Sequence, residues 1–170
     1  MDDCPRPYEF EKAFESLWLN AIHQKFDIEV TDAPHYRRYV MDREGRAPIP
    51  GEGNVWAPFF RARLALNDGK GVVFVSSAGC IYPGEFLPVF CGKFPSDSVV
   101  EVYQSSEIFK VLRDPAALHG RCHDCDYNEL CGGSRARAFA ATGDMLASDP
   151  GCYNVAYGKE APTQFPIAGH

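Results

Sequence analysis

The sequence predicts an α+β protein in which a helix and a strand are followed by a β-hairpin, further helices and a cysteine-rich loop. Apolar residues recur at helical spacing near the N-terminus, and two short apolar runs flank a turn near the middle. Four of the seven cysteines lie between positions 122 and 152. A chain of 170 residues suggests one domain, or one domain plus a fragment, and a hydrophobic content of 45% is sufficient for a core.

The N-terminal region, residues 1–42, is expected to hold one helix and one strand. An amphipathic helix is predicted over residues 9–26, because the apolar residues fall on one face. These are Phe10, Phe14, Leu17, Trp18, Ala21, Ile22 and Phe26. The alternation of Phe26, Ile28 and Val30 then predicts a short strand that ends at Asp32–Pro34. A helix followed by a strand is typical of the last unit of an α/β layer, but it is too little for a complete α/β domain.

The middle of the chain is predicted to change from loop to hairpin to helix. Residues 43–63 are expected to form a linker loop, because glycine and proline are dense there. A linker, a lid and a substrate-facing loop all remain open for this segment. Two apolar runs on either side of Ser76–Gly79 predict a β-hairpin. Residues 98–113 are predicted to form one helix, which Asp114–Pro115 ends.

Another helix is predicted after the cysteine loop. The alanine-rich segment Ser134–Thr142 has Ser134 as its predicted N-cap and Gly143 at its end. The hairpin, the helices and the cysteine loop together form a second predicted unit, residues 64–157. The tail, residues 158–170, has little apolar surface to bury and is expected to be disordered.

The composition argues against several classes of partner. The net charge is -6 and no basic block is present, so we expect no nucleic acid partner. No apolar run approaches the roughly 18 residues needed to cross a bilayer, so we expect no membrane association. The N-terminus, MDDCPRPYEFEK, lacks the apolar stretch of a signal peptide, which favours a cytoplasmic protein. In a reducing cytosol, clustered cysteines bind metals more often than they form disulfides.

The cysteine pattern is the strongest functional signal in the sequence. The clustered cysteines follow the spacing C-x2-C-x5-C-x20-C and are Cys122, Cys125, Cys131 and Cys152. Four thiolates suit an iron–sulfur cluster or zinc. Zinc ribbons typically contain two short cysteine pairs, whereas only Cys122 and Cys125 form such a pair here. The spacing therefore favours an iron–sulfur cluster, while structural zinc, disulfides and free thiols remain open.

The residues around the clustered cysteines support a metal site in this loop. Gly132 and Gly133 let the backbone approach a sulfur atom, and a helix that begins at Ser134 places partial positive charge beside anionic thiolates. Two histidines could bind zinc but are predicted to be ordinary loop residues: His119 and His123. The isolated cysteines are predicted to be small core or loop residues: Cys4, Cys80 and Cys91.

The cysteine segment resembles a known family. The stretch GRCHDCDYNELCGGSRARAFAATGDMLASDPGC is similar to the C-terminal auxiliary-cluster domain of radical S-adenosylmethionine (radical SAM) enzymes, of the SPASM/twitch type. The resemblance extends from about Tyr8 to Tyr153 and is strongest to the subgroup that includes haem-biosynthesis and tungsten-cofactor maturases. The residues that carry it are Cys131–Ala138, Gly143–Asp144, Asp149–Pro150 and Cys152.

The resemblance implies one [4Fe–4S] cluster, held by the four clustered cysteines. It also implies that residues 1–42 are the last helix and strand of a partial (β/α) barrel, and that residues 64–157 form a small twitch-like domain. The family's C-x3-C-x2-C signature binds the cluster that cleaves S-adenosylmethionine, and this sequence contains no such run. We therefore expect a C-terminal portion that is inactive alone and needs a radical SAM barrel, as a missing N-terminal part or a separate subunit. S-adenosylmethionine is expected only in the complete enzyme.

Two positions predict one auxiliary cluster rather than two. Full SPASM domains take ligands for a further cluster from the positions that are Gly84 and Arg135 here, and neither residue ligates iron. In the family, the auxiliary cluster relays an electron or helps to position the substrate of the maturase. Arg135 and Arg137 could contact an anionic substrate, but an ion pair with Asp144 or Asp149 is the favoured interpretation. A stand-alone cluster protein that acts in trans and a zinc-stabilised interaction module remain the alternatives.

Overall fold

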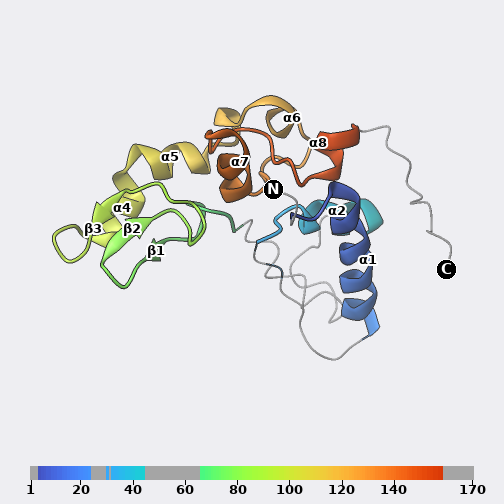
Figure 1. The fold of residues 1–170 in the computed structure, drawn as a ribbon, viewed down its shortest axis with the longest axis horizontal. Helices are drawn as coiled ribbons and strands as arrows, with labels where there is room; N and C mark the ends of the chain where they lie inside the picture. The colour runs from blue at the N-terminus through green and yellow to red at the C-terminus, as the bar shows by residue number, and fades with distance from the viewer. Residues whose placement is uncertain (1–3, 24–29, 31, 45–65, 159–170) are drawn as a thin grey trace.

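The structure is a computed structural model that describes residues 4–23, 30, 32–44 and 66–158. Figure 1 shows a pair of N-terminal helices, a small sheet with two helices beside it, and a group of short helices between them. The helices are α1 (Pro7–His23), α2 (Tyr36–Glu44), α4 (Val99–Ser105), α5 (Glu107–Arg113), η3 (Pro115–Ala117), α6 (Gly120–His123), α7 (Arg135–Thr142) and α8 (Tyr153–Tyr157). The strands are β1 (Phe74–Val75), β2 (Cys80–Tyr82) and β3 (Gly92–Lys93).

The two N-terminal helices share an apolar core. Helix α1 confirms the predicted helix over its described part and begins two residues earlier, at Pro7, while the predicted residues 24–26 lie outside the described residues. The buried core residues come from both helices and the turn between them: Phe14, Ala21, Ala33, Tyr36, Tyr39 and Val40. Burial of each large apolar side chain of this kind contributes about 1.5–3 kcal/mol. Packing of these side chains, rather than local propensity, therefore holds the two helices together.

Helix α2 is an element that the sequence pattern does not predict. Its residues YRRYVMDRE are mostly polar, so the apolar spacing of Tyr36, Tyr39 and Val40 is masked by the charges around it. The predicted strand at 26–30 lies outside the described residues except for Val30. The first two residues of the linker predicted over 43–63, Arg43 and Glu44, are instead the last residues of α2, which corrects that boundary. The rest of the predicted linker and the tail after Gly158 lie outside the described residues.

The predicted β-hairpin is present and is extended by a third strand. Strands β1 and β2 pair antiparallel, with Phe74 opposite Tyr82, and β2 pairs antiparallel with β3. The turn between β1 and β2 closes where the N–H of Gly79 donates to the carbonyl of Ser76 at 2.8 Å. Gly79 has φ of +81°, a left-handed conformation that favours glycine. The sequence analysis does not predict β3, because Gly92–Lys93 carries no apolar alternation.

The prediction of a single helix over residues 98–113 is wrong in one respect, because this segment forms two helices, α4 and α5. Ser106 adopts an extended conformation, with φ of −63° and ψ of 135°, and separates α4 from α5. The N–H of Ser106 still donates to the carbonyl of Val102 and closes α4, but its side chain makes no cap hydrogen bond to α5. The break allows Phe109 and Leu112 of α5 to be buried, whereas α4 buries none of its side chains.

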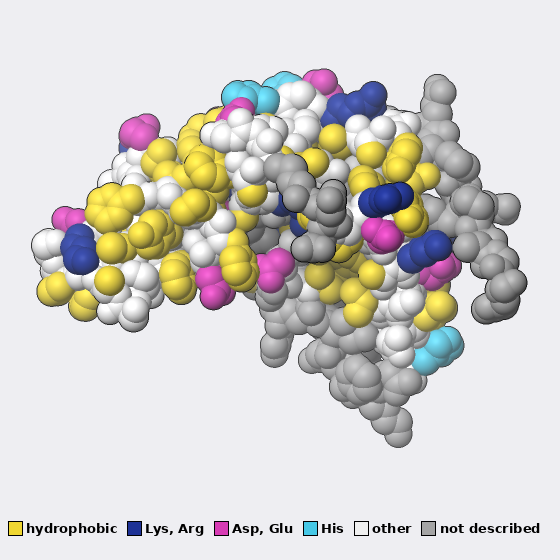
Figure 2. Space-filling model, viewed as in Figure 1, with side chains coloured by type: hydrophobic (Ala, Val, Ile, Leu, Met, Phe, Trp, Pro, Cys, Tyr) yellow, Lys and Arg dark blue, Asp and Glu magenta, His cyan; other side chains and the backbone are white. Residues whose placement is uncertain are grey.

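The sheet buries one set of side chains and exposes another. Ile81 and Leu87 are completely buried. Large apolar side chains remain in solvent around the sheet and α4, and Figure 2 shows hydrophobic side chains gathered over this part of the molecule. The exposed residues include Val73, Val75, Phe86, Phe90, Phe94 and Val100. No helix in the described part of the chain is long and apolar enough to cross a membrane.

Candidate metal centre

The four clustered cysteines line one cavity of about 320 Å³. Cys122 lies in α6, Cys125 and Cys131 lie in the loop that follows, and Cys152 is the N-cap residue of α8. This volume is at the lower end of the roughly 300–1,000 Å³ of typical ligand pockets. The four thiols lie around the walls, and within the described ranges no three cysteine, histidine or acidic side chains converge as the ligands of a single metal ion. All four predicted ligand residues nevertheless face the same cavity.

Backbone and side-chain donors approach two of the cysteine sulfurs. The N–H of Gly133 donates to Sγ of Cys131 at 3.3 Å, and the N–H of Asp149 donates to Sγ of Cys122 at 3.4 Å. A nitrogen of Arg135, Nη2, lies 3.9 Å from the same Cys122 sulfur. Hydrogen bonds of this kind stabilise thiolate and tune iron–sulfur clusters. Two of the four cysteines that line the cavity therefore have N–H donors that would stabilise a thiolate.

Gly133 shapes the loop because no larger residue fits its position. Its φ is +67°, and a Cβ atom there would lie 2.7 Å from Cβ of Asp149 and 3.2 Å from Sγ of Cys122. The side chain of Asn67 holds this turn from a distant segment, because its amide donates to the carbonyl of Cys131 at 3.1 Å and to that of Gly133 at 2.6 Å. The sequence analysis does not identify Asn67, since nothing local marks it as a partner of the cysteine loop.

We expect Gly133→Ala to destabilise the chain more than Gly143→Ala. Both glycines have positive φ, but a Cβ at Gly143 would meet nothing within 4 Å. The backbone strain alone should cost Gly143→Ala about 1–2 kcal/mol. Overpacking should add about 1–3 kcal/mol for Gly133→Ala. Chemical denaturation of the two variants measures the difference, and equal losses would show that the loop relaxes without cost.

Burial raises the pKa of two of the cavity cysteines. The pKa of Cys131 rises to about 12, and that of Cys152 rises to about 11, in both cases chiefly because burial penalises the charged thiolate. The Gly133 N–H opposes this rise at Cys131, and backbone N–H groups of α8 oppose it at Cys152. A bound cation is the usual means of holding such thiols as thiolates, since a coordinating thiol is deprotonated by its metal.

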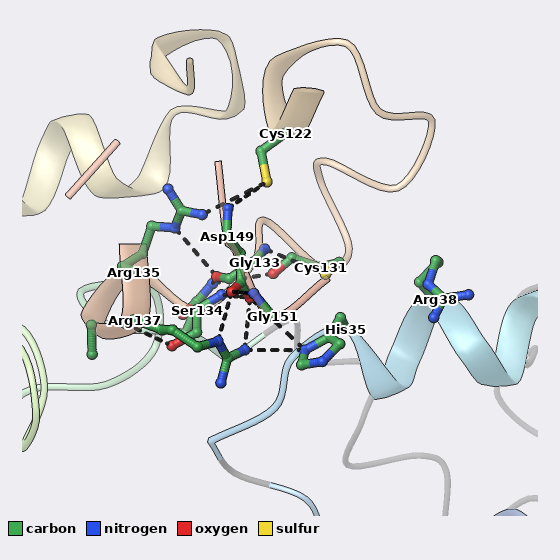
Figure 3. Close-up of polar contacts among 12 residues, drawn as sticks. His35, Arg38, Cys122, Cys131, Gly133, Ser134, Arg135, Arg137, Asp149 and Gly151 are labelled. Atoms are coloured by element: carbon green, nitrogen blue, oxygen red, sulfur yellow. Dashed lines mark hydrogen bonds and ion pairs between the residues drawn. The ribbon is translucent and has the colours of Figure 1, made fainter. Parts of the chain in front are cut away.

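Asp149 joins the segments that surround the cavity. Its carboxylate is fully buried and accepts from Nε and Nη2 of Arg137 at 2.6 and 2.7 Å. It also accepts from the N–H groups of Ser134 and Gly151, at 2.8 and 2.9 Å (Figure 3). Burial alone would raise the pKa of Asp149, but Arg137 and the N–H of Ser134 lower it below its ordinary value. The predicted ion pair between an α7 arginine and Asp149 is confirmed for Arg137.

His35 connects this ion pair to the N-terminal helices. It is fully buried, its ring meets Phe10 and Phe14 edge-on at 4.9 and 4.8 Å, and its Nδ1 lies 3.4 Å from Nη2 of Arg137. Burial lowers its pKa to about 3, and the Asp149 carboxylate opposes this only in part. The neutral imidazole is therefore the form that the folded chain holds. The sequence analysis does not assign a role to His35.

We expect acid to destabilise the chain through His35. Its pKa is about 3 when folded and 6.5 ordinarily, so the unfolded chain binds more protons between these values. Stability from this group is fully present above pH 6.5 and falls by up to about 1.4 kcal/mol per pH unit as the pH drops toward 3. Unfolding of the metal-free chain between pH 7 and pH 4.5 should show this slope. His35→Phe should flatten it, and an unchanged slope in that variant would exclude His35 as the cause.

Arg38 links the helix pair to the cysteine loop. Its guanidinium is buried, pairs with Glu11 of α1 and lies 2.7 Å from Asp42. The hydroxyl of Tyr127, in the cysteine loop, donates to the same Asp42 carboxylate. Arg38 also lines the cavity beside Cys152. Two carboxylates therefore compensate its charge, and the contacts fasten the loop to α1 and α2.

Radical SAM enzymes are among the proteins to which this chain is similar. The chain is 35% identical over 147 residues to the AdoMet-dependent heme synthase of Methanosarcina barkeri, which covers 86% of this chain and 42% of that protein. It is 32% identical over 89 residues to the pre-heme d1 synthase of Dinoroseobacter shibae, covering 50% of this chain and 22% of that protein. It is 32% identical over 90 residues to the PqqA peptide cyclase of Rhodopseudomonas palustris, covering 49% of this chain and 24% of that protein.

The chain spans less than half the length of these relatives. No known family profile matches it, and no solved structure is significantly similar to it. The relatives agree with the general kind of protein that the cysteine segment predicts, namely a radical SAM enzyme of haem or peptide-cofactor maturation.

Proposed function

We propose that this chain binds one [4Fe–4S] cluster through Cys122, Cys125, Cys131 and Cys152. It would form the C-terminal, auxiliary-cluster portion of a radical SAM enzyme that matures a haem-type or peptide-derived cofactor. The observation that carries the proposal is the single cavity lined by all four cysteines. The similarity to heme synthase, pre-heme d1 synthase and PqqA peptide cyclase supports this type of enzyme. Residues 1–42 would then close a (β/α) barrel, and residues 64–157 would be a twitch-like domain.

The environment of Gly84 supports one cluster rather than two. A Cβ atom at Gly84 would collide with the carboxylate of Asp68. That carboxylate accepts from the N–H of Ala136 at 3.0 Å, so it belongs to the frame that positions α7. The pKa of Asp68 is raised by burial, which the Ala136 N–H partly opposes. A thiolate at position 84 would therefore displace a structural contact.

A cluster with four cysteine ligands supplies one-electron transfer, since no iron remains open for a substrate. The chain's own contribution is the fixed position of the thiols, the N–H donors at two sulfurs and the partial exclusion of water by buried Cys122 and Cys152. The chain contains no C-x3-C-x2-C run. Cleavage of S-adenosylmethionine would therefore require a barrel that carries that signature, in the same enzyme or in another subunit.

Anaerobic reconstitution tests the proposal. With iron and sulfide, the chain should bind about four irons and four sulfides and turn brown. Dithionite reduction should produce the electron paramagnetic resonance signal of one cluster. A colourless chain that binds one zinc more tightly than iron would instead identify a structural zinc site. About eight irons per chain would show that a second cluster exists and that the ligand assignment is incomplete.

A further inference from the structure

Arg135 is the most deeply buried cation beside the cysteine cavity. It is the first residue of α7, and only 1% of its surface is exposed. Figure 3 shows its guanidinium directed toward Cys122, while Arg137 of the same helix points toward Asp149 and His35. The two arginines therefore leave α7 in different directions and have different partners.

The guanidinium of Arg135 is hydrogen-bonded without a direct ion pair, although the Asp68 and Asp144 carboxylates interact with it at longer range. Nη1 donates to the carbonyls of Met145 and Ala147 at 3.0 and 2.8 Å, and Nε donates to the carbonyl of Gly133 at 3.3 Å. Carbonyl groups satisfy N–H donors but carry no net charge. Among the described residues, no carboxylate lies within ion-pair distance of Arg135. The nearest group that can become an anion at hydrogen-bond range is the Cys122 sulfur, 3.9 Å from Nη2.

The other arginines near the cavity provide the contrast. Arg38, which is buried, is paired with Glu11 and Asp42, and Arg137, which is partly exposed, is paired with Asp149. Buried Arg37 donates to the carbonyl of Leu66 and also interacts electrostatically with one of the clustered cysteines, Cys131. A buried charge is costly unless an opposite charge compensates it. The position of Arg135 is therefore explained if the cavity contains negative charge when it is filled.

We infer that Arg135 is the counter-charge of the cluster proposed above and raises its reduction potential through Cys122. The inference rests on the proposed function. One-electron reduction adds a negative charge to the bound group, breaks no bond and needs only an external electron donor. A fixed cation at short range in a buried setting favours the more negative state. Hydrogen bonds to ligand sulfurs act in the same direction on cluster potentials.

Arg135→Gln tests the charge, Arg135→Lys retains it, and Arg121→Gln is the matched control. Arg121 lines the cysteine cavity itself but is exposed, so water screens its charge. Each variant is reconstituted, analysed for iron and titrated with dithionite and mediators. At a fixed applied potential, the ratio of reduced to oxidised cluster should fall by about tenfold in Arg135→Gln. For a one-electron couple, this change corresponds to a reduction potential lower by about 59 mV. Arg135→Lys and Arg121→Gln should both remain close to the original chain.

Each outcome decides the inference separately from the proposed function. If the unchanged chain binds no cluster, the proposed function fails. If it binds about four irons and Arg135→Gln leaves the potential unchanged, Arg135 is not the counter-charge. If Arg135→Gln binds no iron, the Arg135→Lys variant decides the question. A reduction potential equal to that of the original chain supports the role of charge. A tenfold change in the ratio of reduced to oxidised cluster in Arg135→Lys overturns it. A shift in Arg121→Gln equal to that in Arg135→Gln would also overturn it.

Discussion

Cys131→Ala is expected to abolish cluster binding. Cys131 lies where the loop turns through Gly132 and Gly133, and its sulfur accepts from the Gly133 N–H. Loss of groups that merely support a ligand typically costs about 10–100-fold in metal affinity. Removal of a ligand itself should cost more, so the reconstituted variant should contain almost no iron. Elemental analysis and the visible spectrum near the iron–sulfur bands measure the loss.

The matched controls are Cys80→Ala and Cys91→Ala. Neither cysteine lines the cavity: Cys80 begins β2, and the Cys91 thiol donates to the carbonyl of Val89 at 3.3 Å. Both variants should bind as much iron as the original chain. Retention of iron by Cys131→Ala, or loss of iron from Cys80→Ala, would contradict the ligand assignment. The three substitutions remove the same thiol group, so they differ only in position.

Asp149→Ala is expected to cause the largest loss of stability outside the cysteines. It would leave the partly exposed Arg137 guanidinium without its partner and would remove the acceptor for the Ser134 and Gly151 N–H groups. Removal of one partner of a fully buried ion pair typically costs about 3–5 kcal/mol, and the partial exposure of Arg137 places the expected loss at the lower end of this range. Urea unfolding followed by circular dichroism measures this cost, with both proteins in the same metal state.

Asp144→Ala is the control for Asp149→Ala. Asp144 also pairs with a basic side chain, His119 at 2.8 Å, but both partners are exposed. An exposed pair contributes about 0–1 kcal/mol, so this variant should unfold at nearly the original urea concentration. If the two aspartate variants lose the same stability, the buried ion pair is not the element that holds α7 to the cysteine segment.

Several features were predictable because their signals are local. Ser134 accepts from the N–H of Arg137 and begins α7, and Gly143, with φ of +78°, ends it. A cap, a turn glycine or an apolar face depends on residues within a few positions, so sequence alone reveals it. The hairpin turn at Ser76–Gly79 belongs to the same class of signal. The break at Ser106 shows the limit, because serine permits a helix boundary but does not require one.

By itself, the sequence determined the four candidate ligands, their spacing and the kind of protein to which the chain is related. Tertiary structure alone decided what surrounds those ligands. Arg137 and His35 are 102 positions apart, and Asn67 reaches Cys131 across 64 positions. The sequence also places Arg135 and Arg137 as equivalent neighbours on one helix, yet one is neutralised by Asp149 and the other is directed at Cys122. Burial and ion pairing arise only when distant segments pack. Local residue patterns therefore do not encode which of the two arginines forms an ion pair with a carboxylate.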